Sequence, residues 1–340
     1  MATIEVKNYQ QKFKNFSLKN INFKVNSGTL HALIGESGSG KSVIIKSIIG
    51  ALPTYKGKIL IDNYNATKAK AKLKLGFSTN LEEFPSELTA YKFLNLLGDL
   101  STISKSYLQY NIKNLMLYFG LWEHRHKKLK SYSSGMKNRI MIIHSMINNP
   151  AIMIFDEPGA NLDYKNRVRF YQFLVLQKQL GKTIFLTTHM IDELESIIDD
   201  CTIISDGKML YSGSYDLFRQ NADYLIKVSN NKLLIKYFQD HNISFIFHPK
   251  NDEFIATMAY NMNLNEFFLY TLKNKLTVIY LKEIKNDLAQ LKLKLARLGY
   301  FQEHLHAEQS QLTKEKGKNE KTIKHFRSYR PRKSSINGND

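Results

Sequence analysis

The chain has 340 residues, of which 43% are apolar, and its 20 Phe and 19 Tyr allow a substantial buried core. This composition excludes wholesale disorder, and the single cysteine, Cys201, excludes an intrachain disulfide framework. The formal net charge of +19 favours acidic partners such as nucleic acid, an anionic membrane surface or a nucleotide, although Lys is spread along the whole chain, as on an ordinary soluble surface.

The N-terminal segment, residues 1–7, has no basic patch followed by an apolar stretch, so no secretory signal is visible. The longest apolar runs, such as 140–147 and 151–155, are much shorter than the roughly 20 residues that cross a bilayer. We therefore expect a chain that does not span a membrane by itself. A lone thiol is compatible with a reducing cytoplasm.

Residues 1–220 alternate between predicted strands and helices, a pattern typical of an α/β domain with a largely parallel sheet. Continuous apolar runs in this region indicate strands that are buried on both faces. Predicted strands lie at 29–34, 151–155 and 183–187, and predicted helices lie at 43–49 and 91–119.

The strand at 29–34 leads into a glycine-rich turn, which matches the P-loop pattern G-x-x-x-x-G-K-[ST] in full over residues 35–42. Glycines let backbone N–H groups turn inward around phosphates, and the following helix points its N-terminus at them. Lys41 is predicted to reach the β- and γ-phosphates of ATP, and the Ser42 hydroxyl to ligate Mg²⁺. The alternative, an ordinary glycine-rich turn, is disfavoured by the Lys-Ser pair and the flanking elements. The predicted nucleotide-binding positions are Gly35, Glu36, Ser37, Gly38, Ser39, Gly40, Lys41, Ser42 and Val43.

A second motif is the apolar strand at 151–155, which is followed directly by Asp156 and Glu157. The C-terminal ends of such strands are where ligands bind in open α/β sheets. Asp156 is placed to hold the Mg²⁺ shell, and Glu157 to polarise the attacking water as a general base. The alternative is an acidic pair in a loop, which the presence of the P-loop disfavours.

Between these motifs, residues 130–137 read Lys-Ser-Tyr-Ser-Ser-Gly-Met-Lys, and here residues 1–220 resemble the ABC ATPase family. The segment 132–136 is similar to the signature loop of that family, which is usually Leu-Ser-Gly-Gly-Gln. Ser133 and Gly135 keep a hydroxyl and a backbone N–H at a helix start, whereas the other three positions differ. In this family these two positions contact the γ-phosphate of ATP bound to the opposite subunit.

Further positions follow in the order of the family. The segment 161–163, with Asp163, resembles the D-loop that crosses the dimer interface, and His189 resembles the switch histidine that senses the γ-phosphate. Tyr9 is the aromatic expected to stack on adenine, with Phe13 as its rival, and either ring could instead belong to the core or the surface.

One position departs from the family pattern. The segment 76–80, Gly-Phe-Ser-Thr-Asn, aligns with the place of a glutamine that ligates Mg²⁺ and couples the site to the membrane subunit. Asn80 carries the same amide on a side chain shorter by one methylene, so either direct contact with Mg²⁺ or a bridging water is possible. The predicted metal ligands are Ser42, Asn80 and Asp156.

The resemblance implies a P-loop NTPase fold of the ABC type with a helical subdomain over residues 1–220. A small α+β accessory domain is predicted over 221–301, and a basic tail, disordered or interacting, over 302–340. In the accessory domain, strands are predicted at 224–228, 244–248, 254–260 and 276–281, and helices at 232–239, 264–272 and 287–298.

The resemblance also implies the ATPase subunit of an ABC transporter, which uses ATP and Mg²⁺ and forms a homodimer or a heterodimer with a second ABC ATPase. Such a subunit lies peripherally on the cytoplasmic face of the cell membrane and binds integral membrane permease subunits near residues 80–89. Residues 134–137, followed by Arg139, resemble the variant found in ABC-2-type export ATPases for drugs, bacteriocins and lipids. Export is therefore expected, with the cargo unspecified.

The alternative is a soluble ABC ATPase that acts on nucleic acid or ribosomes, which the charge of +19 would suit. Ribosome-acting members typically carry two cassettes, whereas this sequence has one P-loop. DNA-repair members place a long coiled coil or a zinc insertion between P-loop and signature, and residues 43–131 have room for neither. We expect no stable nucleic acid partner. A scaffold subunit with a degenerate site is a third reading, which the intact Lys41 and Glu157 disfavour.

Overall fold

The computed structural model describes residues 3–52, 55–78, 85–100, 103–259 and 264–300. The chain divides into two compact units: 1–215 together with 287–289, and 216–286 together with the residues from 290 onward. Within the described ranges, no helix has the length and apolar character needed to cross a membrane. The predicted tail at 302–340 lies outside the described residues.

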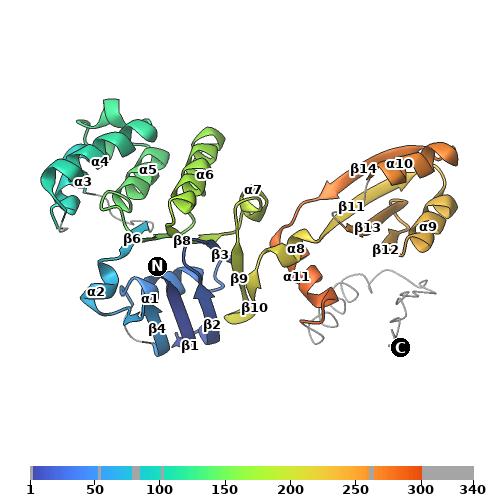
Figure 1. Ribbon diagram of the computed structural model, residues 1–340, viewed down its shortest axis with the longest axis horizontal. Coiled ribbons are helices and arrows are strands. Elements are labelled where there is room, and N and C mark those ends of the chain that lie inside the picture. Colours follow the sequence, from blue (N-terminus) through green and yellow to red (C-terminus); the bar gives the residue numbers. More distant parts are fainter. Residues whose placement is uncertain (1–2, 53–54, 79–84, 101–102, 260–263, 301–340) are drawn as a thin grey trace, which may run out of the picture. The chain divides into compact units, whose positions relative to one another are not determined.

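The first unit contains a ten-stranded sheet with the order β5-β4-β1-β2-β10-β9-β3-β8-β7-β6 (Figure 1). Its strands are β1 (Ile4–Lys12), β2 (Ser17–Val25), β3 (Leu30–Gly35), β4 (Lys56–Ile61), β5 (Tyr64–Asn65), β6 (Leu75–Ser78), β7 (Ile152–Phe155), β8 (Thr183–Thr188), β9 (Asp200–Ser205) and β10 (Lys208–Ser214).

The sheet is parallel only in part. Strands β9, β3, β8, β7 and β6 are parallel neighbours, and β3, β7 and β8 are buried along their whole length, which explains their continuous apolar sequences. The three predicted strands of this unit are therefore confirmed. The expectation of a largely parallel sheet is wrong for β5, β4, β1 and β2, which pair antiparallel. Half-buried antiparallel strands lack long apolar runs, and this is why the sequence did not reveal them.

The helices of the first unit are α1 (Lys41–Ile48), α2 (Ala69–Lys72), α3 (Ala90–Gly98), α4 (Lys105–Tyr118), α5 (Ser134–His144), α6 (Tyr164–Gln179) and α7 (Ile191–Leu194), with 3₁₀ turns at Trp122–His124 and Leu129–Ser131. Helices α3, α4 and α5 gather beside the β6 edge of the sheet as a separate helical group (Figure 1). The single helical stretch expected over 91–119 is wrong. The region is two helices because Ser104 caps a new one, its hydroxyl accepting from the Tyr107 N–H.

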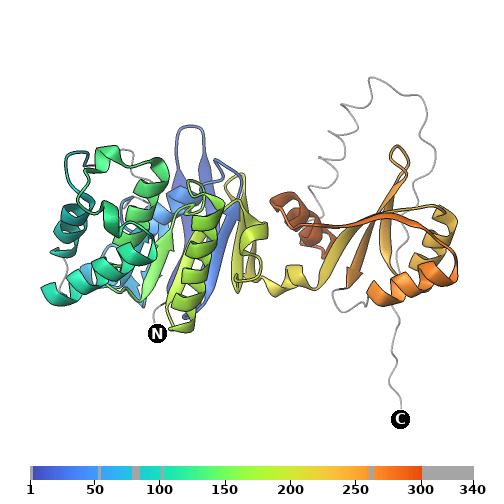
Figure 2. The same ribbon diagram turned by 90° about the horizontal axis from the view of Figure 1, so that it is seen from above.

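The second unit begins with α8 (Asp216–Arg219) and continues as a split βαβ arrangement. Its elements are β11 (Asn221–Val228), α9 (Asn231–Asp240), β12 (Ser244–His248), β13 (Glu253–Ala259), α10 (Leu264–Lys273), β14 (Val278–Ile284) and all but the first two residues of α11 (Leu288–Arg297). The strand order is β12-β13-β11-β14 and every pairing is antiparallel. Helices α9 and α10 cover one face of this sheet (Figure 2). Phe238, Phe254 and Phe267 belong to the core that these helices form with the sheet. All predicted strands and helices of this region are confirmed within a few residues.

Candidate functional site

The loop at 35–42 joins β3 to α1 at the carboxyl end of the parallel strands. Gly40 caps α1 with φ 105°, a left-handed conformation that favours glycine. A Cβ on Gly40 would also lie 2.7 Å from Leu18 Cδ2, and a Cβ on Gly35 would lie 2.5 Å from Ser39 Oγ. Ser39 is buried, whereas Ser37, Gly38 and Ser42 are exposed. The turn therefore has a fixed backbone and an open outer face.

Lys41 lies almost completely inside this loop, with 4% of its surface exposed. Its Nζ donates to the carbonyl oxygens of Gly35 at 2.8 Å and Glu36 at 3.0 Å. The same Nζ is 3.4 Å from Oε1 of Glu157. The ammonium is thus held at the centre of the loop by oxygen atoms, where phosphate oxygens are the natural competing partners.

Asp156 and Glu157 follow β7, and their geometry depends on Thr187 in the neighbouring strand β8. The Thr187 hydroxyl donates to Asp156 Oδ1 at 2.7 Å and accepts from the Glu157 N–H at 2.8 Å. Oε2 of Glu157 is 3.4 Å from Nδ1 of His189, whose side chain is about half exposed. The structure therefore brings together Lys41, Glu157 and His189, as the sequence analysis expects. Thr187 is absent from the predicted site residues. Its position two residues before His189 is the sequence feature that could have indicated its role.

Ser42, which directly follows Lys41, and Asp156, which directly precedes Glu157, carry oxygen donors for a divalent cation. The Ser42 hydroxyl is exposed at the start of α1, and Asp156 presents a partly exposed carboxylate. Hydroxyl and carboxylate oxygens suit Mg²⁺, which keeps most of its coordination for water and phosphate oxygens. The described residues contain no group of three or more His, Cys, Asp or Glu that could hold a metal ion. Asn80, the third predicted ligand, lies outside the described residues, two positions after the end of β6.

Ser133 and Gly135 form a second group with the loop that follows Glu157. The Ser133 hydroxyl caps α5 by accepting from the Met136 N–H at 3.2 Å, and a Cβ on Gly135 would lie 3.0 Å from the Asn161 carbonyl oxygen. Asp163 caps α6, accepting from the Asn166 N–H at 2.8 Å and the Asn166 side-chain amide at 2.8 Å. These two bonds hold the pKa of Asp163 below its usual value. Within the described part of the chain, no hydrogen bond or ion pair joins Ser133 or Gly135 to the loop at 35–42.

The expectation for Tyr9 is not supported by its position. Tyr9 has no exposed surface, and its hydroxyl lies 2.8 Å from Ser47 Oγ inside the core, so its ring cannot stack on a base. Phe13, in the turn after β1, is 39% exposed. A change of strand register between Val6 and Tyr9 turns Tyr9 inward, because one inserted residue reverses the face that each later side chain occupies.

Comparisons with known proteins agree with this geometry. Residues 18–160 match the family model described as ABC transporter. The chain is 32% identical over 260 residues to a putative ABC transporter ATP-binding protein of Mycoplasma pneumoniae, a match that covers 74% of this chain and 79% of that protein. It is 30% identical over 199 residues to the linearmycin resistance ATP-binding protein LnrL of Bacillus subtilis, covering 58% of this chain and 64% of LnrL. The chain spans 60% of the length of an uncharacterized ABC transporter ATP-binding protein of Nostoc, with 31% identity and 59% of this chain covered.

Solved structures give the same result. A structure of the ATP-binding subunit of an ABC transporter superposes with a TM-score of 0.60 and 28% identity, covering 64% of this chain and 92% of that one. A dimeric post-hydrolysis ATP-binding cassette bound to ADP and Pi superposes with a TM-score of 0.56 and 25% identity, covering 62% and 98%.

Proposed function

The chain belongs to the ABC transporter ATP-binding protein family, and we propose that it energises export through separate membrane subunits. It is an ABC ATPase that binds and hydrolyses ATP. The single observation that carries the proposed catalytic site is the convergence of Lys41 and His189 on the two carboxylate oxygens of Glu157, at 3.4 Å each.

In the proposed site, Glu157 takes a proton from the attacking water, Lys41 holds the β- and γ-phosphates, and His189 contacts the γ-phosphate. Ser42 and Asp156 hold Mg²⁺, with Asn80 as a further candidate, and bound Mg²⁺ supplies positive charge near the phosphates. The backbone N–H groups at the start of α1 bind phosphate oxygens because they have no partner within the helix.

A second subunit completes this site in our proposal. Ser133 and Gly135 belong to a different part of the unit from the loop at 35–42, so we infer that each ATP lies between the loop of one chain and the Ser133 region of another. The dimeric state of a similar cassette bound to ADP and Pi supports the participation of a second subunit. The partner is a second copy of this chain or a similar ATPase, and Asp163 lies at the interface between them.

The experiment that tests the site is Glu157→Gln, which keeps the size of the side chain and removes the base. Steady-state ATP hydrolysis should fall by at least about 100-fold, and ATP with Mg²⁺ should trap a dimer that light scattering detects. Glu5→Gln is the matched control, because Glu5 is a partly exposed carboxylate in β1 that pairs with Lys7, and its loss should leave hydrolysis unchanged. Undiminished hydrolysis by Glu157→Gln contradicts the assigned role.

The export role rests on two similarities, to the ABC-2-type signature at 134–137 and to a linearmycin resistance protein. We place the chain on the cytoplasmic face of the cell membrane, with permease subunits near residues 80–89 and cargo of the drug, peptide or lipid type. Pull-down from detergent-solubilised membranes should recover a polytopic membrane protein. Recovery of ribosomes or nucleic acid instead would favour the soluble alternative.

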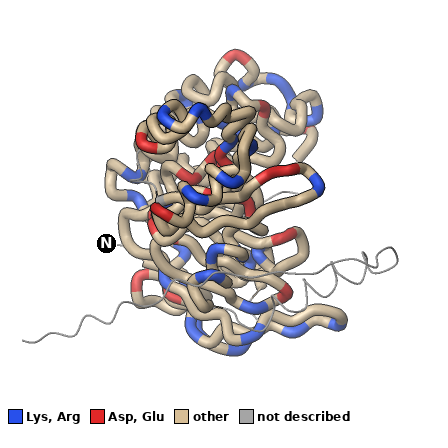
Figure 3. The backbone as a smooth tube through the Cα atoms, turned by 90° about the vertical axis from the view of Figure 1, so that its right-hand side faces the viewer, with Lys and Arg blue, Asp and Glu red and all other residues tan. Residues whose placement is uncertain are grey.

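The formal net charge of +19 is the one observation that favours a soluble ATPase acting on nucleic acid or ribosomes. Lys and Arg lie throughout the described backbone rather than in one segment (Figure 3), and Asp and Glu are interspersed with them. A nucleic-acid surface needs basic residues gathered on one face. We therefore favour transport and expect no stable nucleic acid partner.

A further inference from the structure

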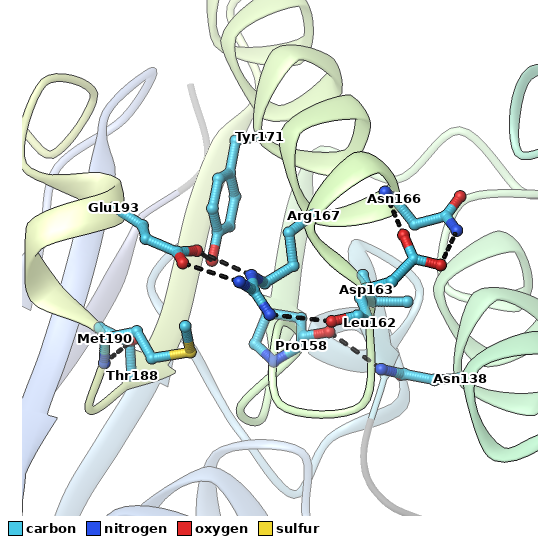
Figure 4. Close-up of polar contacts among 10 residues, drawn as sticks. All are labelled: Asn138, Pro158, Leu162, Asp163, Asn166, Arg167, Tyr171, Thr188, Met190 and Glu193. Atoms are coloured by element: carbon cyan, nitrogen blue, oxygen red, sulfur yellow. Dashed lines mark hydrogen bonds and ion pairs between the residues drawn. The ribbon is translucent and has the colours of Figure 1, made fainter.

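The loop that follows Glu157 is connected to the segment that follows His189 by an arginine. Arg167 lies in the first half of α6, and Glu193 lies in α7, four residues after His189. The two side chains form a bidentate ion pair, with Nε 2.9 Å from Oε2 and Nη2 2.9 Å from Oε1 (Figure 4). Both are about four-fifths buried, so solvent screens the pair only weakly.

The same guanidinium has a third contact on the other segment. Nη1 of Arg167 donates to the Leu162 carbonyl oxygen at 2.9 Å, directly before Asp163. One rigid planar group therefore joins the loop 158–162 to α7. Lys could not reproduce this geometry, because a single ammonium does not present two parallel N–H groups to a carboxylate and a third to a carbonyl.

Tyr171, one turn further along α6, fixes the same arrangement from the side. Its hydroxyl donates to Glu193 Oε2 at 3.2 Å, and burial together with the charge of Glu193 raises its pKa, which keeps it a donor. A Cβ on Gly159 would lie 2.8 Å from this hydroxyl and 3.3 Å from Arg167 Cδ. The loop thus packs directly against the side chains that bind Glu193.

The opposite side of the loop contacts α5, the helix that Ser133 caps. The Asn138 side-chain amide donates to the Pro158 carbonyl oxygen at 2.9 Å (Figure 4). Between the loop and the His189 segment, Glu157, Tyr171 and His189 line a cavity of about 10 Å³, which is only large enough for a water molecule. The loop is therefore enclosed between α5 and the His189 segment.

We infer that Arg167 and Glu193 are positioning residues, which make the loop 158–162 and the His189 segment move as one body during hydrolysis. The inference rests on the proposed roles of Glu157 and His189. Neither positioning residue belongs to the predicted nucleotide-binding set. If the pair is loosened, His189 and the loop lose their fixed relation to Glu157, and a misplacement of about 1 Å can cost up to about 100-fold in rate.

The test uses Arg167→Lys, Glu193→Gln and the double variant in the full chain. Each single variant should lower kcat for ATP hydrolysis by about tenfold to 100-fold and leave KM for ATP within a few-fold, because the loop at 35–42 is untouched. In the double variant, kcat should fall no further than in the worse single variant, because both changes break the same ion pair.

Lys178→Gln is the matched control on the same helix. Lys178 Nζ also binds a carboxylate, that of Asp199 at 2.9 Å, and a backbone carbonyl, that of Ile197 at 3.0 Å. It lies at the C-terminal end of α6, so this variant should lose comparable thermal stability but keep kcat. A kcat loss in Lys178→Gln equal to that of Arg167→Lys would overturn the inference.

Amide hydrogen exchange supplies a readout that does not depend on activity. The Leu162 N–H donates to the Gly159 carbonyl oxygen inside the loop, and it should exchange faster in Glu193→Gln although the mutation is in α7. If the exchange of this N–H and kcat are both unchanged while Glu157→Gln is inactive, the inference is wrong and the proposed site stands. An active Glu157→Gln contradicts the proposed site instead.

Discussion

Glu157 combines an uncommon backbone conformation with several polar contacts at the end of β7. Its φ is +47°, a left-handed value that costs a residue with a Cβ on the order of 1 kcal/mol. The bond from its N–H to Thr187 Oγ1 helps to stabilise this conformation, and the conformation directs the carboxylate toward Lys41 and His189. Strain of this kind persists where the surrounding structure holds it, and it supports the proposed role of Glu157 in the reaction.

The aromatic residue that binds the base can be identified by substitution. Phe13→Ala should weaken ATP binding by about tenfold, since stacking of a base on a ring contributes about 1–3 kcal/mol. Tyr9→Phe is the control, because it removes only the hydroxyl near Ser47 from the core and should cost stability without changing the affinity. Fluorescent nucleotide titration measures both. Unchanged ATP affinity in Phe13→Ala would contradict the assignment of Phe13.

At the scale of elements, the helical group is fitted closely to the β6 edge of the sheet. Gly76 in β6 meets the end of α5 so tightly that a Cβ would lie 1.7 Å from the Ser145 carbonyl oxygen and 2.6 Å from Pro150 Cγ. A backbone carbonyl and a proline ring have little freedom to move aside. The position of α5, and of the Ser133 cap at its other end, therefore depends on a glycine in the neighbouring strand.

Gly76→Ala should destabilise the first unit by about 1–3 kcal/mol through this overpacking. Gly98→Ala in α3 is the comparison variant and should lose less, because the three atoms nearest to its new Cβ belong to the Leu108 side chain rather than to a backbone carbonyl and a proline ring, and alanine favours the helix. Urea unfolding followed by circular dichroism measures the difference. An equal loss in the free energy of unfolding of the two variants would show that the backbone around Ser145 moves aside without cost.

At the scale of the whole molecule, the two units have separate cores. The first core contains Leu33, Ile45 and Phe185, and the second contains Tyr237, Phe254 and Phe267. All described residues of the proposed site belong to the first unit. The limits predicted at 220 and 301 remain a proposal for the domain boundaries.

Calorimetry should therefore resolve two unfolding transitions, of which ATP with Mg²⁺ raises only the one that belongs to the first unit. With Glu157→Gln to prevent turnover, nucleotide at about 100 times its Kd should add about 2.7 kcal/mol to that unit. Lys41→Ala should abolish the shift because it removes the ammonium that we propose as the phosphate ligand. A single transition, or an equal shift of both, contradicts the independence of the units.

Much of the site was predictable because its motifs are contiguous. The loop at 35–42 and the pair after 155 can be recognised from neighbouring residues alone, since a strand, a turn and a helix start are local structures. The elements of the second unit were predictable for the same reason, as their apolar patterns are short and regular. The sequence by itself thus determined the fold class, the family and the ATPase activity.

Contacts between distant residues were decided only by the tertiary structure. The bulge that turns Tyr9 inward, the Thr187 hydroxyl between Asp156 and Glu157, and the pairing of Arg167 with Glu193 each depend on how separate segments pack. Sequence spacing fixes which face of an element a residue occupies, but not which residue of another element lies opposite it. The physical reason is that such pairings follow from the register and packing of the whole sheet, to which every strand and helix contributes.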